Sequence, residues 1–408
     1  MTAAETASDL ACFTGRRGGS DAERRAALWL SDRLRSQGRA ATIETFWCRP
    51  NWALAHAWHA ILGLGATVLI VSQPRIGGGL ALVAVASIAF DAATGRSLGR
   101  RFTPERASQN VVAPDPAEAP DAARLIVTAN YDAGRTGLVY RTGPRMLAAT
   151  LRRAAAGGRL TPGWLGWLTI ALLWLVVIAI VRNGGTSGTP IDVLQLVPSI
   201  GLLAAAVALL ELSLSATSPG ASDNAAGVAV ALATIAALDG RPDAHPARGV
   251  AVDLVLQGAS DGDGTGLRRY LRRSRHARPF VIGIAACGSG SPHWWRSDGS
   301  LWPLRYDRRL TELAAGAAPS TDGSPAESTV GSPSGHRGRG IAPALTARAT
   351  GLPAISIGCV DEHGLAPRSH RLTDVVDALE PGSLEATAHF AVELITAIER
   401  SARPAVTA

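Results

Sequence analysis

The chain has 408 residues, enough for one large domain or two ordinary ones, and its formal net charge is +7 at pH 7. All of the basic charge is arginine, and the arginines are scattered or flank apolar runs instead of alternating with aromatic residues. This pattern argues against a nucleic-acid surface of the stacking type, so we expect no nucleic-acid partner. The cysteines are far apart and form no CxxC pair, which indicates neither a disulfide framework nor a zinc ribbon.

The first 50 residues predict the beginning of an α/β domain. No apolar signal-peptide segment follows Met1. Residues 21–37 place small and apolar side chains on one helical face and arginines on the others, and a glycine follows, so we expect an amphipathic helix. The alternating pattern of residues 41–47 predicts a strand.

Four apolar runs follow in two pairs. Residues 52–72 contain no arginine, aspartate or glutamate, and residues 76–90 form a shorter run of similar character. Residues 164–181 and 191–210 form the second pair, joined by a glycine-rich turn. The runs approach the ~20 residues that a helix needs to span a bilayer. Tryptophans near several run ends are typical of membrane interfaces.

These runs predict transmembrane hairpins over residues 52–92 and 164–214, and the alternative is two buried hairpins of a soluble core. If all four runs cross, every soluble piece lies on one side of the membrane. Arginines beside the runs are concentrated on that side, whereas the two opposite loops hold only Arg75 and Arg182. Because positive flanks favour the cytoplasm, we predict a multi-pass plasma-membrane protein with a cytoplasmic soluble domain.

The soluble pieces, residues 1–50, 93–163 and 215–408, together carry an α/β pattern. The expected strands are residues 110–113, 125–129, 250–257 and 280–286, and the expected helices are residues 225–238, 264–273 and 382–400. Strands that alternate with helices predict a mostly parallel central sheet flanked by helices. Reactive side chains of such sheets gather at the carboxyl ends of the strands. A stretch rich in serine, proline and glycine, residues 315–340, is typical of a mobile surface loop.

Asp223 stands in a turn rich in proline, glycine and serine, directly before an apolar helical pattern that begins near Gly227. One interpretation is an N-cap that complements the helix dipole. The other is a metal ligand, because a turn that fixes a carboxylate in space suits a divalent ion. The choice depends on the polar residues at the expected strand ends. These are Asn130, Tyr131, Asp132, Ser260, Asp261 and Cys287, with His370 and Asp374 in a late segment.

Five segments, in this order, resemble metallopeptidase family twenty-eight, the di-zinc aminopeptidases. They are GRRGGSDAERRAALWLSDRLRSQG; NVVA followed by LIVTANYD; SPGASDNAAGVA; LVLQGASD; and GLPAISIG with SHRLTDVVDALEPGSLE. The third is similar to the family's most specific motif, Gly-Ala-x-Asp-Asn-x-x-Gly. The resemblance covers the whole soluble part. It implies the zinc aminopeptidase fold, with the two apolar hairpins as insertions.

The resemblance implies that half of a metal site is retained. Asp223 matches the carboxylate that bridges the two zinc ions, and His370 matches the late histidine ligand. Asp261 replaces a glutamate ligand and is one methylene shorter. Asp132 and Asn224 match supporting positions. Three protein ligands and one water form a catalytic type of zinc shell, so zero or one zinc ion is expected.

The other half departs from the family. Asn130 stands where a histidine ligand is usual, and an amide oxygen is a poor zinc ligand beside imidazole. Cys287 or a neighbour stands where a second aspartate is usual, and it is either a thiolate ligand or a buried free cysteine. Ser260 replaces the glutamate general base and cannot accept a proton from water near neutral pH. Candidate replacements for the lost groups are Asp263, His293, His336, Asp361, Glu362 and His363.

We therefore predict a membrane-anchored pseudo-peptidase that binds a peptide-like ligand or a protein partner. The alternative is a zinc-dependent aminopeptidase or amide hydrolase with one metal ion. A third alternative is a transporter with a soluble regulatory domain. This alternative is weaker, because the runs offer no ionisable pair to line a pathway. His56 and His59 lie one turn apart near the polar end of the first run, and they are either interfacial residues or a metal or proton-relay pair.

Overall fold

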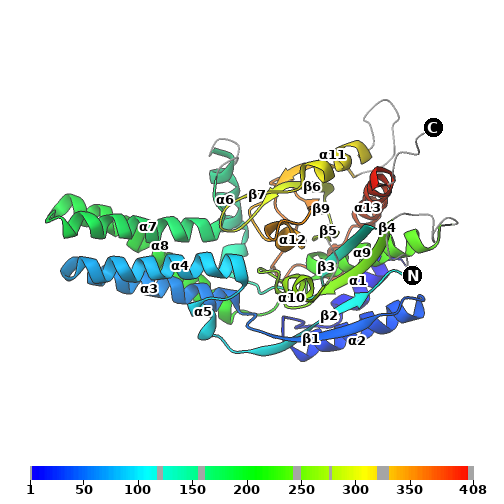
Figure 1. Cartoon of the computed structure of the whole chain (residues 1–408), viewed down its shortest axis with the longest axis horizontal. Coiled ribbons are helices and arrows are strands. Elements are labelled where there is room, and N and C mark those ends of the chain that lie inside the picture. Colours follow the sequence, from blue (N-terminus) through cyan, green and yellow to red (C-terminus); the bar gives the residue numbers. More distant parts are fainter. Residues whose placement is uncertain are drawn as a thin grey trace.

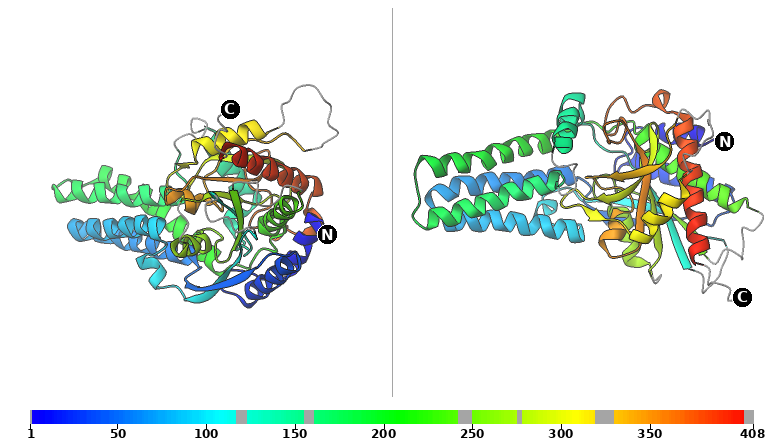
Figure 2. Two further views of the ribbon diagram at one scale, coloured as in Figure 1. Left: turned by 45° about the vertical axis from the view of Figure 1, so that its right-hand side comes forward. Right: turned by 90° about the horizontal axis from the view of Figure 1, so that it is seen from above.

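The computed structural model describes residues 2–116, 123–154, 161–241, 250–274, 278–318 and 330–402. An α/β domain holds the central sheet, and a bundle of long helices projects from one side of it (Figure 1). Two further views show the bundle leaving the domain on the side away from the two chain termini (Figure 2). Residues 319–329 of the predicted loop 315–340 lie outside the described residues, and residues 334–337 of it form a strand.

In the described ranges, the central sheet has nine strands in the order β1-β2-β4-β3-β5-β9-β6-β7, with β8 paired to β6. Their bounds are β1 Thr42–Cys48, β2 Arg106–Ala113, β3 Ala123–Asn130, β4 Val250–Gln257, β5 Phe280–Ile284, β6 Ser291–Asp298, β7 Leu304–Arg305, β8 Ser334–Arg337 and β9 Ala354–Val360. The central strands β4, β3, β5 and β9 run parallel. On both sides of them the pairs β1–β2, β2–β4, β9–β6 and β6–β7 are antiparallel.

The predicted mostly parallel sheet is therefore wrong in part, because the sheet is mixed. The prediction rested on the apolar central strands, which are buried along nearly their whole length as parallel strands usually are. Strand β6 contains charged and polar residues and was not anticipated. It turns back along β9 and extends the sheet with antiparallel strands.

Helices cover both faces of the sheet, and alternate strand residues point to opposite sides. Val127, Leu254 and Ile282 face a core formed with α1, α2, α9, α11 and α13. Ile126 and Val255 face a second core formed with α10 and α12. The bounds are α1 Ala3–Ala11, α2 Asp21–Ser36, α9 Gly227–Asp239, α10 Thr265–Arg273, α11 Arg308–Ala317, α12 Leu345–Ala349 and α13 Pro381–Ala402.

The bundle consists of α3 Trp52–Ser72, α4 Pro74–Thr94, α7 Trp164–Asn183 and α8 Thr189–Leu214. Each of the predicted apolar runs lies in one of these helices. Leu172 and Leu202 are fully buried in the bundle core, and a side chain on Gly63 would overlap Leu172 and press closely on Leu202. The bundle's outer surface is apolar, with Val68 72% and Ile180 66% exposed. Shorter helices α5 Leu98–Arg101, η1 Leu138–Tyr140 and α6 Thr142–Ala154 join the bundle to the domain.

Among the residues that the structure describes, five helical segments are long and apolar enough to cross a membrane, one more than predicted. The fifth is Ala221–Asp239, which combines the Asp223 turn with α9. Its apolar window is 78% buried, compared with 28–44% for the four bundle helices. The difference arises because α9 packs against β3, β4 and β5, so its apolar character belongs to the core of the α/β domain.

His56 and His59 are buried within the bundle, close to the α/β domain. The Nδ1 atoms of the two rings are 3.2 Å apart, and His59 Nε2 is 2.8 Å from Ser87 Oγ. His56 Nε2 is 3.4 Å from a carboxylate oxygen of Asp91. The expectation that the apolar runs offer no ionisable pair is therefore wrong at this end of the bundle, where a short polar network joins α3 to α4.

Candidate functional site

Asp223 lies in the turn η3, Ala221–Ala226, which leads into α9. The carboxylate of Asp374, from the late segment, accepts hydrogen bonds from the backbone N–H groups of Ser222 at 2.7 Å and Asp223 at 3.1 Å. The Asp223 side chain does not cap the helix, since no side-chain cap hydrogen bond is present at α9. Instead, one of its carboxylate oxygens accepts a hydrogen bond from the Ser369 hydroxyl.

Arg16 also holds this turn and was not identified from the sequence as a site residue. Its side chain is completely buried, and its guanidinium donates hydrogen bonds to the carbonyl oxygens of Tyr131 at 3.0 Å, Pro219 at 2.9 Å and Gly220. Burial lowers the pKa of Arg16 to about 10, although Asp374 and other carboxylates oppose the change. The only sequence signal was its place in the GRRGG motif.

Asp132 follows β3 and fixes the loop that follows β4. Its carboxylate accepts hydrogen bonds from the backbone N–H groups of Ser260 at 3.1 Å and Asp261 at 3.0 Å. Burial, together with nearby Glu23 and Asp261, raises the pKa of Asp132 well above its usual range. Asn224 donates a hydrogen bond to the Asp132 carbonyl oxygen at 3.3 Å, which links this loop to the Asp223 turn.

His370 meets Asp223 and Asp261 at the centre of the site. Its Nδ1 donates to the carbonyl oxygen of Arg135 at 2.9 Å, which leaves Nε2 facing the two carboxylates. Nε2 is 3.4 Å from Asp261 Oδ1 and 3.9 Å from Asp223 Oδ2. Tyr140 stacks on the imidazole with ring centroids 4.3 Å apart. The structure therefore brings together the three residues predicted as a half-site.

The charges of this trio are coupled. Burial lowers the pKa of His370, but Asp261 and Asp223 outweigh that effect, and the net pKa is raised. Burial raises the pKa of Asp261 to about 6 in spite of His370. The close approach depends on Gly134, because a Cβ atom there would overlap both the imidazole and the Asp261 carboxylate.

Ser260, Cys287 and Asn130, the positions where the family's functional residues are replaced, make no hydrogen bond or ion pair with this trio among the residues described. Ser260 is fully buried, donates to the Gly258 carbonyl oxygen at 3.1 Å and accepts a hydrogen bond from Gly266 N at 2.8 Å. Its hydroxyl therefore supports the first turn of α10. Cys287 is also fully buried, and burial raises the pKa of its thiol well above the usual range. Asn130 is 5% exposed, and its Oδ1 has no hydrogen-bond partner among the residues described.

The donor set does not fit two zinc ions. Within the described ranges, no group of three or more His, Cys, Asp and Glu side chains meets the requirements of a metal centre. The Asp261 Oδ1 to His370 Nε2 distance of 3.4 Å matches the roughly 3.4 Å between neighbouring ligand atoms of a tetrahedral zinc shell. Asp223 is farther away and is already bound by Ser369. A second zinc ion would need Asn130 and the thiol of Cys287, which its raised pKa keeps protonated, as ligands.

The candidate replacement groups make other contacts. Asp263 forms an ion pair with Arg100 at 2.9 Å, and His336 packs edge-on against Trp295. His293 Nδ1 donates to the Ser291 carbonyl oxygen, and His363 pairs with Glu362 at 3.5 Å. Asp361 accepts hydrogen bonds from N–H groups of its own loop. None of these contacts reaches Asp223, Asp261 or His370 in the described part of the chain.

The site opens where the α/β domain meets the bundle. A crevice of about 110 Å³ is lined by Asp132 and Asp261 of the domain and by Trp52 and Leu212 of the bundle helices. A larger apolar cavity of about 610 Å³ lies along α7 and α8, and it shares Trp52, Leu212 and the His370 neighbour Tyr140 with the site. The bundle therefore forms one wall of the site.

Glu23 on α2 bonds the loop after β4 and is expected to make the free energy of unfolding depend on pH. It is fully buried and accepts hydrogen bonds from Gly19 N, Ala259 N and the Ser108 hydroxyl. Burial raises the pKa of Glu23 to about 7. The folded chain therefore binds a proton that the unfolded chain releases, and stability is lost as the pH rises from about 5 through 7.

We expect the thermal midpoint of the full chain in detergent to fall between about pH 5.5 and pH 8. Glu23→Gln imitates the protonated acid and should flatten this pH dependence. The loss of unfolding free energy over this pH range should become smaller by on the order of 2–3 kcal/mol. Glu385→Gln changes an exposed glutamate and should leave the slope intact. An unchanged slope in Glu23→Gln would contradict the assignment.

Comparison with known proteins identifies the fold. No family model and no curated protein matches the sequence. Among solved structures, the chain is similar to an aminopeptidase from Aneurinibacillus sp. strain AM-1, with a TM-score of 0.54, 13% identity, and coverage of 98% of this chain and 94% of that one. A zinc aminopeptidase from Bacillus subtilis has a TM-score of 0.53 and 12% identity, with coverage of 98% of this chain and 94% of that one. A glutaminyl cyclase from Porphyromonas gingivalis has a TM-score of 0.50 and 12% identity, with coverage of 98% of this chain and 97% of that one. The chain thus has the fold of these two aminopeptidases and of the glutaminyl cyclase, as expected from the resemblance.

Proposed function

We propose that the protein is a membrane-anchored domain of the aminopeptidase fold that binds a ligand without hydrolysing it. The observation that carries the proposal is the hydroxyl of Ser260, which is buried and bonded into the start of α10. A hydrolase needs a group at this position that accepts a proton from the attacking water. Loss of such a group typically lowers the rate by roughly 10²–10⁴.

The retained residues favour binding of a peptide-like ligand. Two carboxylates, Asp223 and Asp261, face the single imidazole of His370, so the site carries an excess of negative charge at neutral pH when both are ionised. A free amino group of a peptide suits such a site, because an opposite charge compensates buried carboxylates. The adjoining apolar cavity beside Tyr140 suits an apolar side chain or tail of the same ligand.

Four observations support anchoring in the plasma membrane with the α/β domain in the cytoplasm. The bundle helices are long and apolar, their outer faces are exposed, and tryptophans lie at their domain ends. Arginines flank the same ends of the helices. If the hairpins belonged to a soluble protein, these apolar outer faces would lie in water, which is unfavourable for surfaces of this size. The polar network of His56 and Asp91 lies only at the domain end, which gives little support to a transport pathway.

A second candidate function is a zinc-dependent aminopeptidase with one metal ion. The observation that favours it is the convergence of Asp223, Asp261 and His370, with the Nδ1 of His370 fixed on a carbonyl oxygen as metal-binding histidines usually are. These three residues would hold the ion, which would polarise a carbonyl group and activate water when bound. In the described part of the chain, the expected position of the general base is occupied by the buried hydroxyl of Ser260.

The deciding measurement is the zinc content of the detergent-purified full chain by mass spectrometry, with hydrolysis of aminoacyl p-nitroanilides measured on the same samples. We expect less than stoichiometric zinc, no hydrolysis, and a thermal midpoint unaffected by chelator. His370→Ala tests the site, and His389→Ala is the matched control because His389 is exposed on α13. One zinc per chain that is lost in His370→Ala and kept in His389→Ala, together with hydrolysis, would replace this proposal with the one-zinc enzyme.

A further inference from the structure

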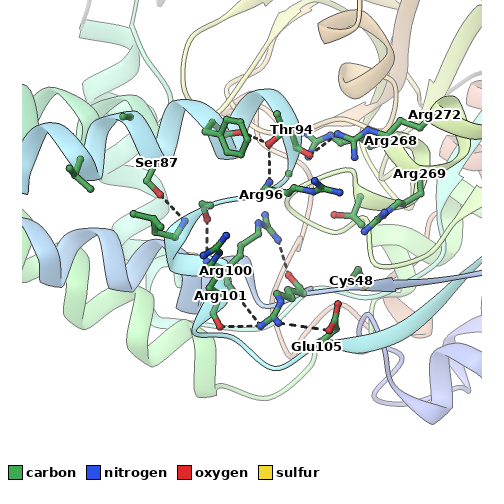
Figure 3. A pocket seen from close by; sticks show the side chains of 18 residues that line it. Cys48, Ser87, Thr94, Arg96, Arg100, Arg101, Glu105, Arg268, Arg269 and Arg272 are labelled. Atoms are coloured by element: carbon green, nitrogen blue, oxygen red, sulfur yellow. Dashed lines mark hydrogen bonds and ion pairs between the residues drawn. The ribbon is translucent and has the colours of Figure 1, made fainter.

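A cavity of about 750 Å³ lies on the outside of the junction between bundle and domain, away from the carboxylate site. Its walls come from the last three turns of α4, the short helix α5 and one side of α10 (Figure 3). Segments far apart in the sequence meet here, because Arg272 of α10 donates a hydrogen bond to the Thr94 carbonyl oxygen at the end of α4 at 2.8 Å. The cavity therefore sits where the apolar bundle surface ends.

Arginine dominates this cavity. The lining contains seven arginines and a single acidic residue, Glu105. The seven are Arg49, Arg96, Arg100, Arg101, Arg268, Arg269 and Arg272. Arg100 is paired with Asp91 and Asp263, and Arg49 is 3.8 Å from Glu105. For the other five, no carboxylate lies within 4.0 Å in the part of the chain that the structure describes.

Two of these five arginines are held in place by hydrogen bonds to the backbone. Arg269 donates to the Trp47 carbonyl oxygen at 2.9 Å, in addition to the bond between Arg272 and Thr94. Gly95 ends α4 with a φ of 70°, and any side chain there would overlap the guanidinium of Arg268. Five like charges gathered in this way repel one another, so an anion that enters the cavity is strongly favoured.

An apolar wall accompanies the charge. Val83 and Phe90 lie on the outer face of α4 and are 46% and 55% exposed. Leu98 of α5 is 44% exposed beside them. In the proposed membrane orientation, this face of α4 contacts acyl chains and the arginines lie at the level of the headgroups. A ligand with one phosphate and an adjoining hydrocarbon chain matches both walls.

We propose that this cavity binds the phosphate-bearing headgroup of an anionic membrane phospholipid, with an acyl chain along α4. Arginine guanidinium groups bind phosphate oxygens through two parallel hydrogen bonds, and basic pockets beside membrane helices are suited to anionic headgroups. The proposal rests on the proposed membrane insertion. A soluble phosphate has the same charge chemistry but makes no use of Val83 and Phe90.

The test uses the full chain purified in detergent and analysed by native mass spectrometry with added phosphatidylglycerol, phosphatidylcholine or inorganic phosphate. We expect one retained phosphatidylglycerol, little phosphatidylcholine, and no displacement by millimolar inorganic phosphate. The double variant Arg96→Gln with Arg272→Gln removes two exposed charges without touching a buried ion pair. It should weaken phosphatidylglycerol retention about tenfold or more.

The control double variant Arg308→Gln with Arg400→Gln removes the same charge from α11 and α13, remote from the bundle (Figure 1). It should retain the lipid like the wild type. Equal losses in both double variants, equal retention of both lipids, or displacement by inorganic phosphate would each overturn the lipid site. Insertion into nanodiscs of pure phosphatidylcholine is measured separately, because failure there would refute the membrane anchor and not the headgroup preference.

Discussion

Replacing Arg16 with leucine is expected to lower the free energy of unfolding by about 3–5 kcal/mol, because a buried charged group and all of its hydrogen bonds are lost together. The guanidinium serves the carbonyl oxygens of Tyr131, Pro219 and Gly220, and leucine would leave these groups buried without this donor. The carboxylates of Asp374 and Asp132 would also lose their nearby cation. The measurement is the thermal unfolding of the full chain in detergent, with an expected fall in the midpoint of roughly 5–10 °C.

Two further variants separate this role from a general effect of charge. Arg17→Leu removes the neighbouring exposed arginine and should change the midpoint little. Arg16→Lys keeps the charge but cannot donate to three carbonyl oxygens in the same plane, so an intermediate midpoint is expected. If Arg16→Leu unfolds at the same temperature as Arg17→Leu, Arg16 does not hold the Asp223 turn.

Replacing Arg100 with leucine is expected to destabilise the junction between bundle and domain by a similar amount, about 3–5 kcal/mol. Arg100 is 5% exposed and bonds Asp91 of α4 at 2.6 Å and Asp263 before α10 at 2.9 Å. It also donates to the Arg49 carbonyl oxygen at 2.7 Å. Without it, two carboxylates would remain buried next to each other with no cation between them. The expected readout is a lower thermal midpoint and faster proteolysis of the residues around α5.

A triple variant tests whether the unpaired carboxylates cause the loss of stability in Arg100→Leu. Adding Asp91→Asn and Asp263→Asn to Arg100→Leu removes the uncompensated charges, so part of the lost stability should return. Arg101→Leu is the matched control, since the structure gives Arg101 no ion pair and leaves its side chain exposed. A triple variant no more stable than Arg100→Leu alone would show that the loss comes from packing and not from the unpaired carboxylates.

The sequence by itself determined the long apolar helices, the central strands and the candidate residues at the strand ends. The apolar runs have the length and uniform composition of long helices, and α3, α4, α7 and α8 follow them. The apolar strands and the polar residues after them placed Asp132 and Asp261 at strand ends, because parallel strands end at one edge of a sheet. The identity of Ser260 was sufficient to question hydrolysis, since a hydroxyl is a poor base whatever its surroundings.

Only the tertiary structure decided which residues meet. The direction of β6 depends on its pairing with β9, and a local pattern carries no record of the partner strand. The contact between Arg16 and the Asp223 turn joins residues 203 positions apart, and the hydrogen bond between His370 and Arg135 joins residues 235 positions apart. The arginines of α5 and α10 likewise form one cavity only because the chain brings the end of α4 against α10. Such contacts arise from the packing of distant segments, for which spacing along the chain gives no measure.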